Sequence, residues 1–355
     1  MLFAITKTGL DVFDAARAWG LAALIGDLTQ DEVRVRDIGW QFLVDSDSDV
    51  GTVGQVSQFP IVPPDTDSVW RNVFVTSGES ERQKKIEKVR ELIVRLASEP
   101  AVMQGIFGGD WSDHVFVSRG GESLPGALDP AAFKGVRQQT RARYAEDQLK
   151  VEERHWALAC LGMALCGSYR KVRTAGGQRY LVLLPIPHDV RVYQPSEFGE
   201  LTRWTQEVGH AAAATMAAHA AVDLAARLRK RAAVYGQLRD RFSEIVFFEL
   251  FRTGNQPKPA QGNHVRLERL LTVVANDPHR AEGILAWLDY CFRRGAVKGF
   301  QELALAATEF TFRWDLDSYE RLVRVFVRML ASGGIKMVQR PSEEVMREVI
   351  GYVTI

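Results

Sequence analysis

The chain has 355 residues, of which 46% are hydrophobic and 25% are charged, a balance that is typical of a globular protein and excludes wholesale disorder. The length allows two domains of ordinary size. The formal net charge of +1 excludes a global field that would draw nucleic acid or a membrane, so any basic surface must be local.

The N-terminus and the cysteines indicate an intracellular protein. Lys7, Asp11 and Asp14 follow the first apolar residues at once, so no signal peptide is predicted. The longest charge-free helical run, 208–222, is shorter than the roughly 20 apolar residues that a membrane span needs. The three cysteines include no C-x-x-C pair, which fits a reducing compartment and excludes a disulfide framework. We therefore expect a cytoplasmic protein.

The N-terminal part of the chain predicts mixed α/β structure. A short strand is expected over Leu2–Thr6, and the helix after it carries one apolar stripe. The stripe consists of Val12, Ala16, Trp19 and Ala23. A second strand is expected over Gly39–Val44, followed by a loop or a pair of weak strands over Asp45–Asp67. Ser80 and Gln83 form a capping-box pattern that begins an amphipathic helix.

The middle of the chain predicts a buried helix followed by a basic hairpin. Asp129 and Pro130 supply an N-cap and a first-turn proline for a helical region. The last part of that region, His155–Cys166, is apolar on nearly all sides and should be buried. The hairpin consists of a strand, a turn and a second strand, over Ser168–Arg173, Thr174–Gly177 and Gln178–Leu184. Pro185 and Pro187 are expected to end the second strand.

From about residue 198 onward the pattern predicts helices alone. The expected helices are Leu201–Ala233, Tyr235–Arg252, His264–Asn276, His279–Arg294, Phe300–Thr308, Ser318–Ala331 and Ser342–Val353. A loop is expected over Gly254–Gly262. The clearest apolar stripe runs from Leu316 to Leu330, and Asp317 and Glu320 are expected to cap that helix. The sequence therefore predicts an α+β fold dominated by helices. Its domains are a mixed α/β body over residues 1–200, which contains the basic hairpin, and an all-helical C-terminal bundle over residues 201–355.

Charge is distributed unevenly along the chain. Residues 1–78 contain 11 acids and 5 bases, whereas residues 134–173 contain 9 bases and 4 acids. Four basic clusters are candidates for binding nucleic acid. Their residues are Lys134, Arg137, Arg141 and Arg143; Arg170, Lys171, Arg173 and Arg179 on the hairpin; Arg229 and Lys230; and Arg321, Arg324 and Arg328.

The spacing of these clusters suggests how each could contact nucleic acid. The sets that begin at Lys134 and at Arg321 are spaced i, i+3, i+7, so each forms one stripe on a helix, and the second stripe is nearly free of acids. A two-stranded ribbon such as the hairpin is narrow enough to approach a groove. Any one cluster can instead be a solvated face or a set of cations near a helix C-terminus. Four clusters together predict at least one contact with a polyanion.

Catalytic and metal-binding motifs are incomplete. The alternating aspartates of 45–49 begin like a calcium loop, but the Gly and Glu that such a loop needs further on are missing. The S-x-x-K sequence Ser168–Lys171 lacks its companion motifs, and His188 with Asp189 is better explained as a turn than as a metal pair. No other histidines have ligand spacing, and no glycine-rich phosphate-binding motif occurs. We therefore expect a non-catalytic binding subunit without metal or cofactor.

Two blocks of the sequence resemble a known family. The first is Thr8–Leu24, TGLDVFDAARAWGLAAL, and the second is the helix His155–Cys166 followed by the basic hairpin and Tyr180–Pro187, YLVLLPIP. Together these blocks, about 60 residues, resemble the large subunit of type I CRISPR surveillance (Cascade) complexes in its shorter I-A and I-B forms. The chain departs from many members of that family in being short. Neither block is a diagnostic motif.

The resemblance implies a fold and a set of partners. An α/β body followed by a helical C-terminal region would sit near the 5′ end of a guide RNA, contact the motif that flanks the target in double-stranded DNA, and help to open the duplex. The partners would be guide RNA, target DNA, other subunits of a ribonucleoprotein complex and a separate nuclease-helicase, with no membrane. Sequence would be read mainly by RNA–DNA pairing.

Two alternatives belong to other classes of protein. A helical scaffold or regulatory protein that binds only other proteins fits the helical C-terminal half and the balanced charge equally well. The third hypothesis is an enzyme whose active site does not match any of these motifs. A co-purifying RNA of uniform length would decide between these classes.

Overall fold

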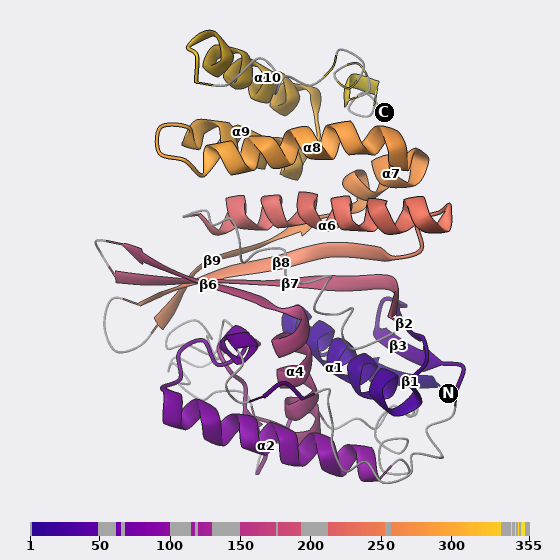
Figure 1. Ribbon diagram of the computed structural model, residues 1–355. Helices are drawn as coiled ribbons and strands as arrows, with labels where there is room; N and C mark the ends of the chain where they lie inside the picture. Colours follow the sequence, from indigo (N-terminus) through magenta and orange to yellow (C-terminus); the bar gives the residue numbers. More distant parts are fainter. Residues whose placement is uncertain are drawn as a thin grey trace, which may run out of the picture. The chain divides into compact units, whose positions relative to one another are not determined.

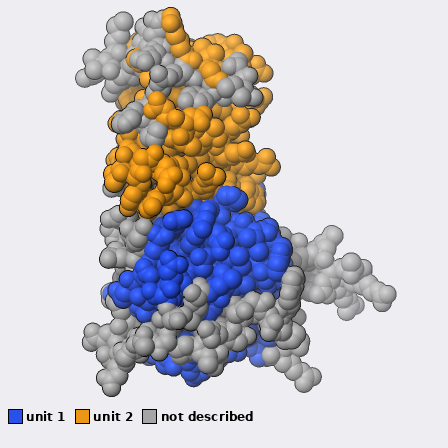
Figure 2. All heavy atoms as spheres, turned by 90° about the vertical axis from the view of Figure 1, so that its right-hand side faces the viewer, with its two compact units in different colours: residues 1–203, 248–262 blue, residues 204–247, 263–355 orange. Residues whose placement is uncertain are grey.

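The computed structural model describes residues 2–48, 62–64, 68–99, 115–117, 120–129, 150–174, 177–192, 212–252 and 257–334, together with 342, 345, 347 and 349–351. The chain divides into two compact units, which Figure 2 colours separately. Unit 1 comprises Met1–Arg203 and Phe248–Gly262, and unit 2 comprises Trp204–Phe247 and Asn263–Ile355. The α+β class is confirmed, with a mixed N-terminal region and helices in the C-terminal part.

A mainly antiparallel sheet forms the centre of unit 1 (Figure 1). Its strands, in spatial order, are β1 (Leu2–Thr6), β3 (Gln41–Ser46), β2 (Val33–Asp37) and β7 (Gly177–Val192), with β6 (Ser168–Thr174) paired to β7. The order continues through β8 (Arg241–Arg252) and β9 (Pro257–Arg266), of which residues 248–252 and 257–262 belong to unit 1. The predicted basic hairpin is therefore confirmed as β6 and β7.

Two buried helices of unit 1 cross with their backbones in contact. The helices are α1 (Asp11–Thr29) and α4 (Glu153–Cys166), and both are apolar around most of their circumference. A Cβ atom at Gly20 would overlap the carbonyl oxygen of Leu158, and one at Gly162 would overlap that of Ala16. Glycine is needed on both helices because any side chain would push the backbones apart. Figure 1 shows this crossing.

Polar contacts fix α1 within unit 1. The indole N–H of Trp19 donates to the carbonyl oxygen of Pro185, 2.9 Å away, and so ties α1 to β7. Asp14 accepts hydrogen bonds from Thr8 and from the guanidinium of Arg17, which is fully buried. Burial and then the charge of Arg17 lower the pKa of His155, whose ring lies 3.2 Å from that guanidinium. The imidazole ring of His155 is therefore neutral. Asp14, Arg17 and His155 form a buried polar cluster with a structural role.

The helix α2 (Glu79–Ser98) packs on α4 through the apolar face expected from the sequence. The expected capping box is wrong, because the N-cap is Gly78 and no side chain caps the helix. A short 3-10 helix, η2 (Ser68–Asn72), precedes α2, and its Trp70 is fully buried. The remaining short strands, β4 (Glu122–Ser123) and β5 (Lys150–Val151), pair with each other.

Helices form most of unit 2. They are α6 (Ala213–Tyr235), α7 (Glu268–Asn276), α8 (Pro278–Gly295), α9 (Gln301–Arg313) and α10 (Leu316–Ala331). Successive helices pack against each other, and the ring of Trp287 meets those of Tyr319 and Phe326 edge to face. No helix in the part of the chain that the structure describes is long and apolar enough to cross a membrane.

Three local expectations are wrong. The helix predicted over Tyr235–Arg252 is strand β8 from Arg241 onward, because the run Ile245–Leu250 is buried throughout and rich in β-branched and aromatic residues. The predicted loop 254–262 includes the start of β9, and the helix expected from His264 begins at Glu268. The segment after residue 198 therefore contains two strands as well as helices.

Two ends of elements also differ from expectation. The prolines of 185–187 do not end β7, which runs to Val192. They lie between the residues that pair with β6, 177–183, and those that pair with β2, 189–192, so neither pairing needs a proline N–H. The N-cap of α10 is Asp315, which forms a capping box with Ser318. The expected cap residues, Asp317 and Glu320, do not have that role.

Candidate nucleic-acid interface

A basic hollow of about 460 Å³ lies in unit 1, between the β6–β7 hairpin and the segment from η2 to the start of α2. Its charged lining residues are Arg71, Arg82, Lys171 and Arg252, and none of its described lining residues is acidic. Two tyrosines, Tyr169 and Tyr180, complete the hairpin wall. The site therefore combines concentrated positive charge with aromatic surface.

Strand geometry places the hairpin residues of the hollow on one face. Tyr169 and Lys171 are two residues apart on β6, and Lys171 lies opposite Tyr180 on β7. Side chains at alternate positions of a strand, and those directly opposite on its partner, share one face of the sheet. The rings of Tyr169 and Tyr180 stack, with centroids 6.1 Å apart, and the ammonium of Lys171 lies 5.8 Å from the centre of the Tyr180 ring.

The opposite wall is held by the end of helix α4. The side-chain amide of Asn72 donates to the carbonyl oxygens of Ala164 and Gly167, at 3.2 and 2.8 Å. Gly167 is the residue that leads from α4 into β6, so η2 and the hairpin are fixed to the same point. Arg71 lies in the last turn of η2 and Arg82 in the first turn of α2, and both line the hollow opposite the hairpin.

Three basic groups of the hollow are available to an anion. Among the described residues, no ion pair engages Arg71, Arg82 or Lys171. Burial raises the pKa of the Tyr169 hydroxyl to about 12, with a further rise from Tyr180, against the opposing charges of Arg71 and Arg82. The hydroxyl therefore stays protonated at neutral pH and can donate a hydrogen bond. Every one of these groups suits a phosphate oxygen.

Two other predicted hairpin bases with described side chains, Arg170 and Arg179, do not line the hollow. Arg170 projects from the opposite face of β6 and is half-buried, as alternation along the strand requires. Arg179 on β7 forms an ion pair with the buried carboxylate of Glu249 at 3.2 Å. The backbone of Arg173 lies in β6, but its side chain is outside what the structure describes. Of the three predicted hairpin bases whose side chains the structure describes, Lys171 alone lines the hollow.

The stripe predicted over Lys134, Arg137, Arg141 and Arg143 lies outside the described residues and stays a prediction. In unit 2, Arg229 forms an ion pair with Glu282 at 3.0 Å, and Lys230 is exposed. These two residues are not joined with any other candidate into one described site.

The arginines of α10 are engaged by carboxylates. Arg321 and Arg328 pair with Glu309 and Glu302 of the neighbouring helix α9. Arg324 pairs with Glu320, one turn earlier on α10, at 2.9 Å. The expectation of a stripe nearly free of acids is wrong, because Glu320 lies one turn from Arg324 on α10 itself and α9 supplies two further acids that spacing along α10 cannot reveal.

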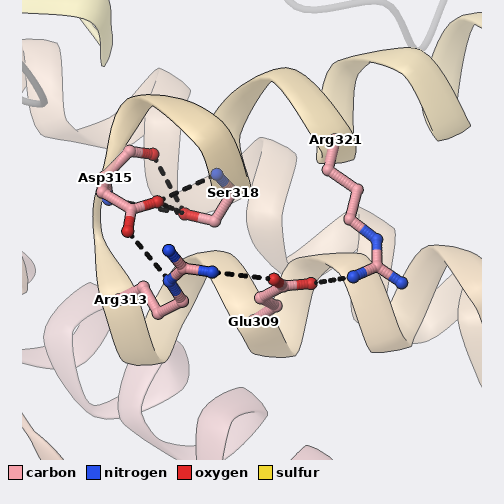
Figure 3. A network of polar contacts seen from close by, with 5 residues as sticks. All are labelled: Glu309, Arg313, Asp315, Ser318 and Arg321. Carbon is pink, nitrogen blue, oxygen red and sulfur yellow. Dashed lines mark hydrogen bonds and ion pairs between the residues drawn. The ribbon is translucent and has the colours of Figure 1, made fainter.

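A polar network joins α9 to the start of α10 (Figure 3). The carboxylate of Glu309 binds both Arg321 and Arg313, and Arg313 also binds Asp315 at 2.8 Å. Asp315 in turn accepts from the backbone N–H of Ser318 as the cap of α10. These arginines therefore have partners within their own unit.

Sequence reasoning missed most of the hollow. Arg71, Arg82, Tyr169 and Arg252 were not candidates, and Tyr180 was considered only as part of a strand. The signal that could have found the tyrosines is the Tyr-x-Lys pattern on one hairpin strand opposite a tyrosine on the other. No such signal marks Arg71, Arg82 and Arg252, because they come from other segments of the chain.

Groups suited to metal or nucleophilic chemistry are scarce in the described part of the chain. No cluster there contains three or more His, Cys, Asp or Glu side chains that could hold a metal ion. Burial raises the pKa of all three cysteine thiols, which disfavours the reactive thiolate. Asp189, which follows His188 and could have formed a metal pair with it, instead accepts two hydrogen bonds from the guanidinium of Arg34, at 2.7 and 2.5 Å.

Comparison with known proteins gives a relative but no family. No protein-family model matches the chain. A protein of Archaeoglobus fulgidus that bears the description "Uncharacterized protein" is 26% identical over 359 residues, which cover 98% of this chain and 97% of that protein. The similarity therefore runs through both units.

Proposed function

We propose that this chain is a non-catalytic nucleic-acid-binding protein, and that the basic hollow of unit 1 holds phosphate groups of its ligand. The observation that carries the proposal is the set of cations in the hollow, Arg71, Arg82 and Lys171, which have no carboxylate partner among the described residues. Like charges held close together repel each other, and a phosphate that enters the hollow relieves that repulsion. Neutralised phosphates release counterions, which drives association.

The wider setting that we propose is a cytoplasmic ribonucleoprotein complex of the Cascade type. In it, the chain contacts guide RNA and the flanking motif of target DNA beside other subunits, and a separate nuclease-helicase cleaves the target. The support is the resemblance of two sequence blocks, which pack against each other in unit 1 through the α1–α4 crossing. The contact from Trp19 to Pro185 also joins the two blocks. The blocks are therefore parts of one structural core.

The test compares two triple variants that remove the same charge. In the hollow variant, Arg71, Arg82 and Lys171 are each replaced by Ala. In the control variant, Arg321, Arg324 and Arg328 are each replaced by Ala. Binding of a fluorescent oligonucleotide is measured by anisotropy over a range of salt concentrations. Because net charge changes equally, any difference between the variants reports on position and pairing.

We expect the hollow variant to weaken binding for every sequence alike. The slope of log K against log salt should fall in magnitude by roughly 2 to 3 if three phosphate contacts are lost. The control variant should keep the wild-type slope, because its arginines are already paired. Equal slopes for all three proteins, each folded by circular dichroism, would remove the basis of the proposal and leave the protein-only scaffold as the better reading.

A further inference from the structure

The hollow contains an aromatic component that phosphate binding alone does not require. Tyr169 is half-buried and lines the hollow, and its ring is backed by the buried ring of Tyr180. A supported aromatic ring beside a group of cations is the combination by which proteins hold single strands, since bases stack on the ring while cations track the backbone. Duplex DNA keeps its bases inside and offers no such face to a side chain.

The shape of the hollow points the same way. Its volume of about 460 Å³ falls within the roughly 300 to 1,000 Å³ of sites that enclose a small organic molecule. A duplex is convex and carries its phosphates on the outside, so a concave hollow of this size admits at most single groups that project from it. An unstacked nucleotide brings a base and a phosphate into such a hollow together.

We propose that the hollow takes one unpaired nucleotide of a single-stranded nucleic acid, with its base against Tyr169 and its phosphate among Arg71, Arg82 and Lys171. This inference rests on the proposed function and specifies the ligand of that same site. The base contact gives preference for single strands over duplex with little preference for sequence, because every base has a face that can stack. The protonated hydroxyl of Tyr169 adds a donor toward the phosphate.

The experiment separates the base from the phosphate. The probes are a labelled 12-residue oligothymidine, an abasic strand of the same length, and a duplex of the same length. Wild-type protein should bind the oligothymidine about tenfold or more tightly than the abasic strand, which has the same phosphates but no bases. Equal affinity for these two strands, or tighter binding of the duplex, would overturn the inference.

Variants at Tyr169 assign that difference to one ring. Tyr169→Leu removes the ring and should abolish the preference for bases, whereas Tyr169→Phe keeps the ring and should preserve it. The triple alanine variant of the hollow should weaken binding of the oligothymidine and the abasic strand by the same factor. If the triple variant weakens binding while Tyr169→Leu leaves the base preference intact, the inference fails and the proposed function stands. If the triple variant has no effect, the proposed function itself fails.

Two measurements on the wild-type protein cover the case in which Tyr169→Leu does not fold. An oligonucleotide with 5-iodouracil, irradiated in the complex, should crosslink to the peptide that contains Tyr169, as located by mass spectrometry. Uridine monophosphate should compete with the oligothymidine at lower concentration than inorganic phosphate does. A crosslink confined to other peptides, or equal competition by the two compounds, contradicts the inference.

Discussion

The hollow in unit 1 has four basic side chains and the arginine stripe of α10 in unit 2 has three, but the two regions differ in how those charges are paired. In the hollow, the described neighbours of Arg71, Arg82 and Lys171 include no acid in ion-pair contact. On α10, every arginine of the stripe is bound to a carboxylate. A cation is available to a ligand when no neighbouring carboxylate already binds it. The number of cations on a surface does not show whether they are available.

The difference has an energetic meaning. An exposed ion pair such as those on α10 contributes little to stability, of the order of 0 to 1 kcal/mol, but a phosphate that binds there must displace a carboxylate. In the hollow, Arg71, Arg82 and Lys171 have no carboxylate among the described residues that a phosphate would have to displace. We therefore expect the same charge to bind a polyanion more strongly in unit 1 than on α10.

The largest expected effect comes from charge reversal in the two regions. Arg71→Glu combined with Arg82→Glu should weaken binding of an oligonucleotide by about 100-fold or more, because two contacts of about 1.5 to 3 kcal/mol each are replaced by repulsion. The matched pair Arg321→Glu and Arg324→Glu should change affinity by no more than about threefold. Anisotropy titrations measure both. Similar losses from both pairs would show that net charge alone governs binding.

A smaller effect is expected when the pairing on α10 is broken. Glu309→Gln removes the carboxylate that Arg313 and Arg321 share, so α10 should come to resemble the hollow. We expect oligonucleotide affinity at low salt to rise by roughly two- to threefold, and the free energy of unfolding to change by less than about 1 kcal/mol. The gain should vanish at high salt. An unchanged affinity at low salt would mean that pairing does not limit what these arginines can bind.

The smallest effect concerns pH. The pKa of Tyr169 is raised from 10 to about 12, so the folded chain keeps a proton that the unfolded chain loses over that range. The free energy of unfolding should therefore fall as pH rises from about 10 to about 12, and Tyr169→Phe should reduce that fall. Between about pH 7 and 9, Tyr169 should add no pH dependence to oligonucleotide affinity. Difference absorbance of wild type against Tyr169→Phe measures the titration, and a midpoint at 10 would contradict the assignment.

Periodicity predicted most of the fold. The strand β1, the helices α1 and α4, the β6–β7 hairpin and the helices of unit 2 followed from apolar spacing and turn residues. The strand β2 was missed although Val33 and Val35 alternate with arginines, since only five residues carry the pattern. The strand β8 was missed because a strand buried on both sides resembles a buried helix. In both cases the deciding factor is a neighbouring strand, which lies elsewhere in the sequence.

The site was less accessible to sequence reasoning than the fold. Lys171 was found because it belongs to a local run of bases on a hairpin. Arg71 and Arg82 reach it because Asn72 donates to the end of α4, a contact between residues far apart in the chain. The arginines of α10 were misjudged for the converse reason, since the acids that engage them come mostly from α9. Spacing along one element shows which charges share a face and leaves out what another element places against them.

The glycine crossing of α1 and α4 anchors the hairpin wall of the hollow. Because no side chain separates the two backbones, no rotamer change can loosen the contact, and α4 leads through Gly167 directly into β6. The hairpin is also held at its other end, because β7 lies between β2 and β8 in the sheet and a Cβ atom at Gly177 would overlap the carbonyl oxygen of Arg252. Tyr169 and Lys171 therefore lie on a wall that is supported at both ends. A ligand would meet a surface that is already in place before it binds, which lowers the cost of ordering the site.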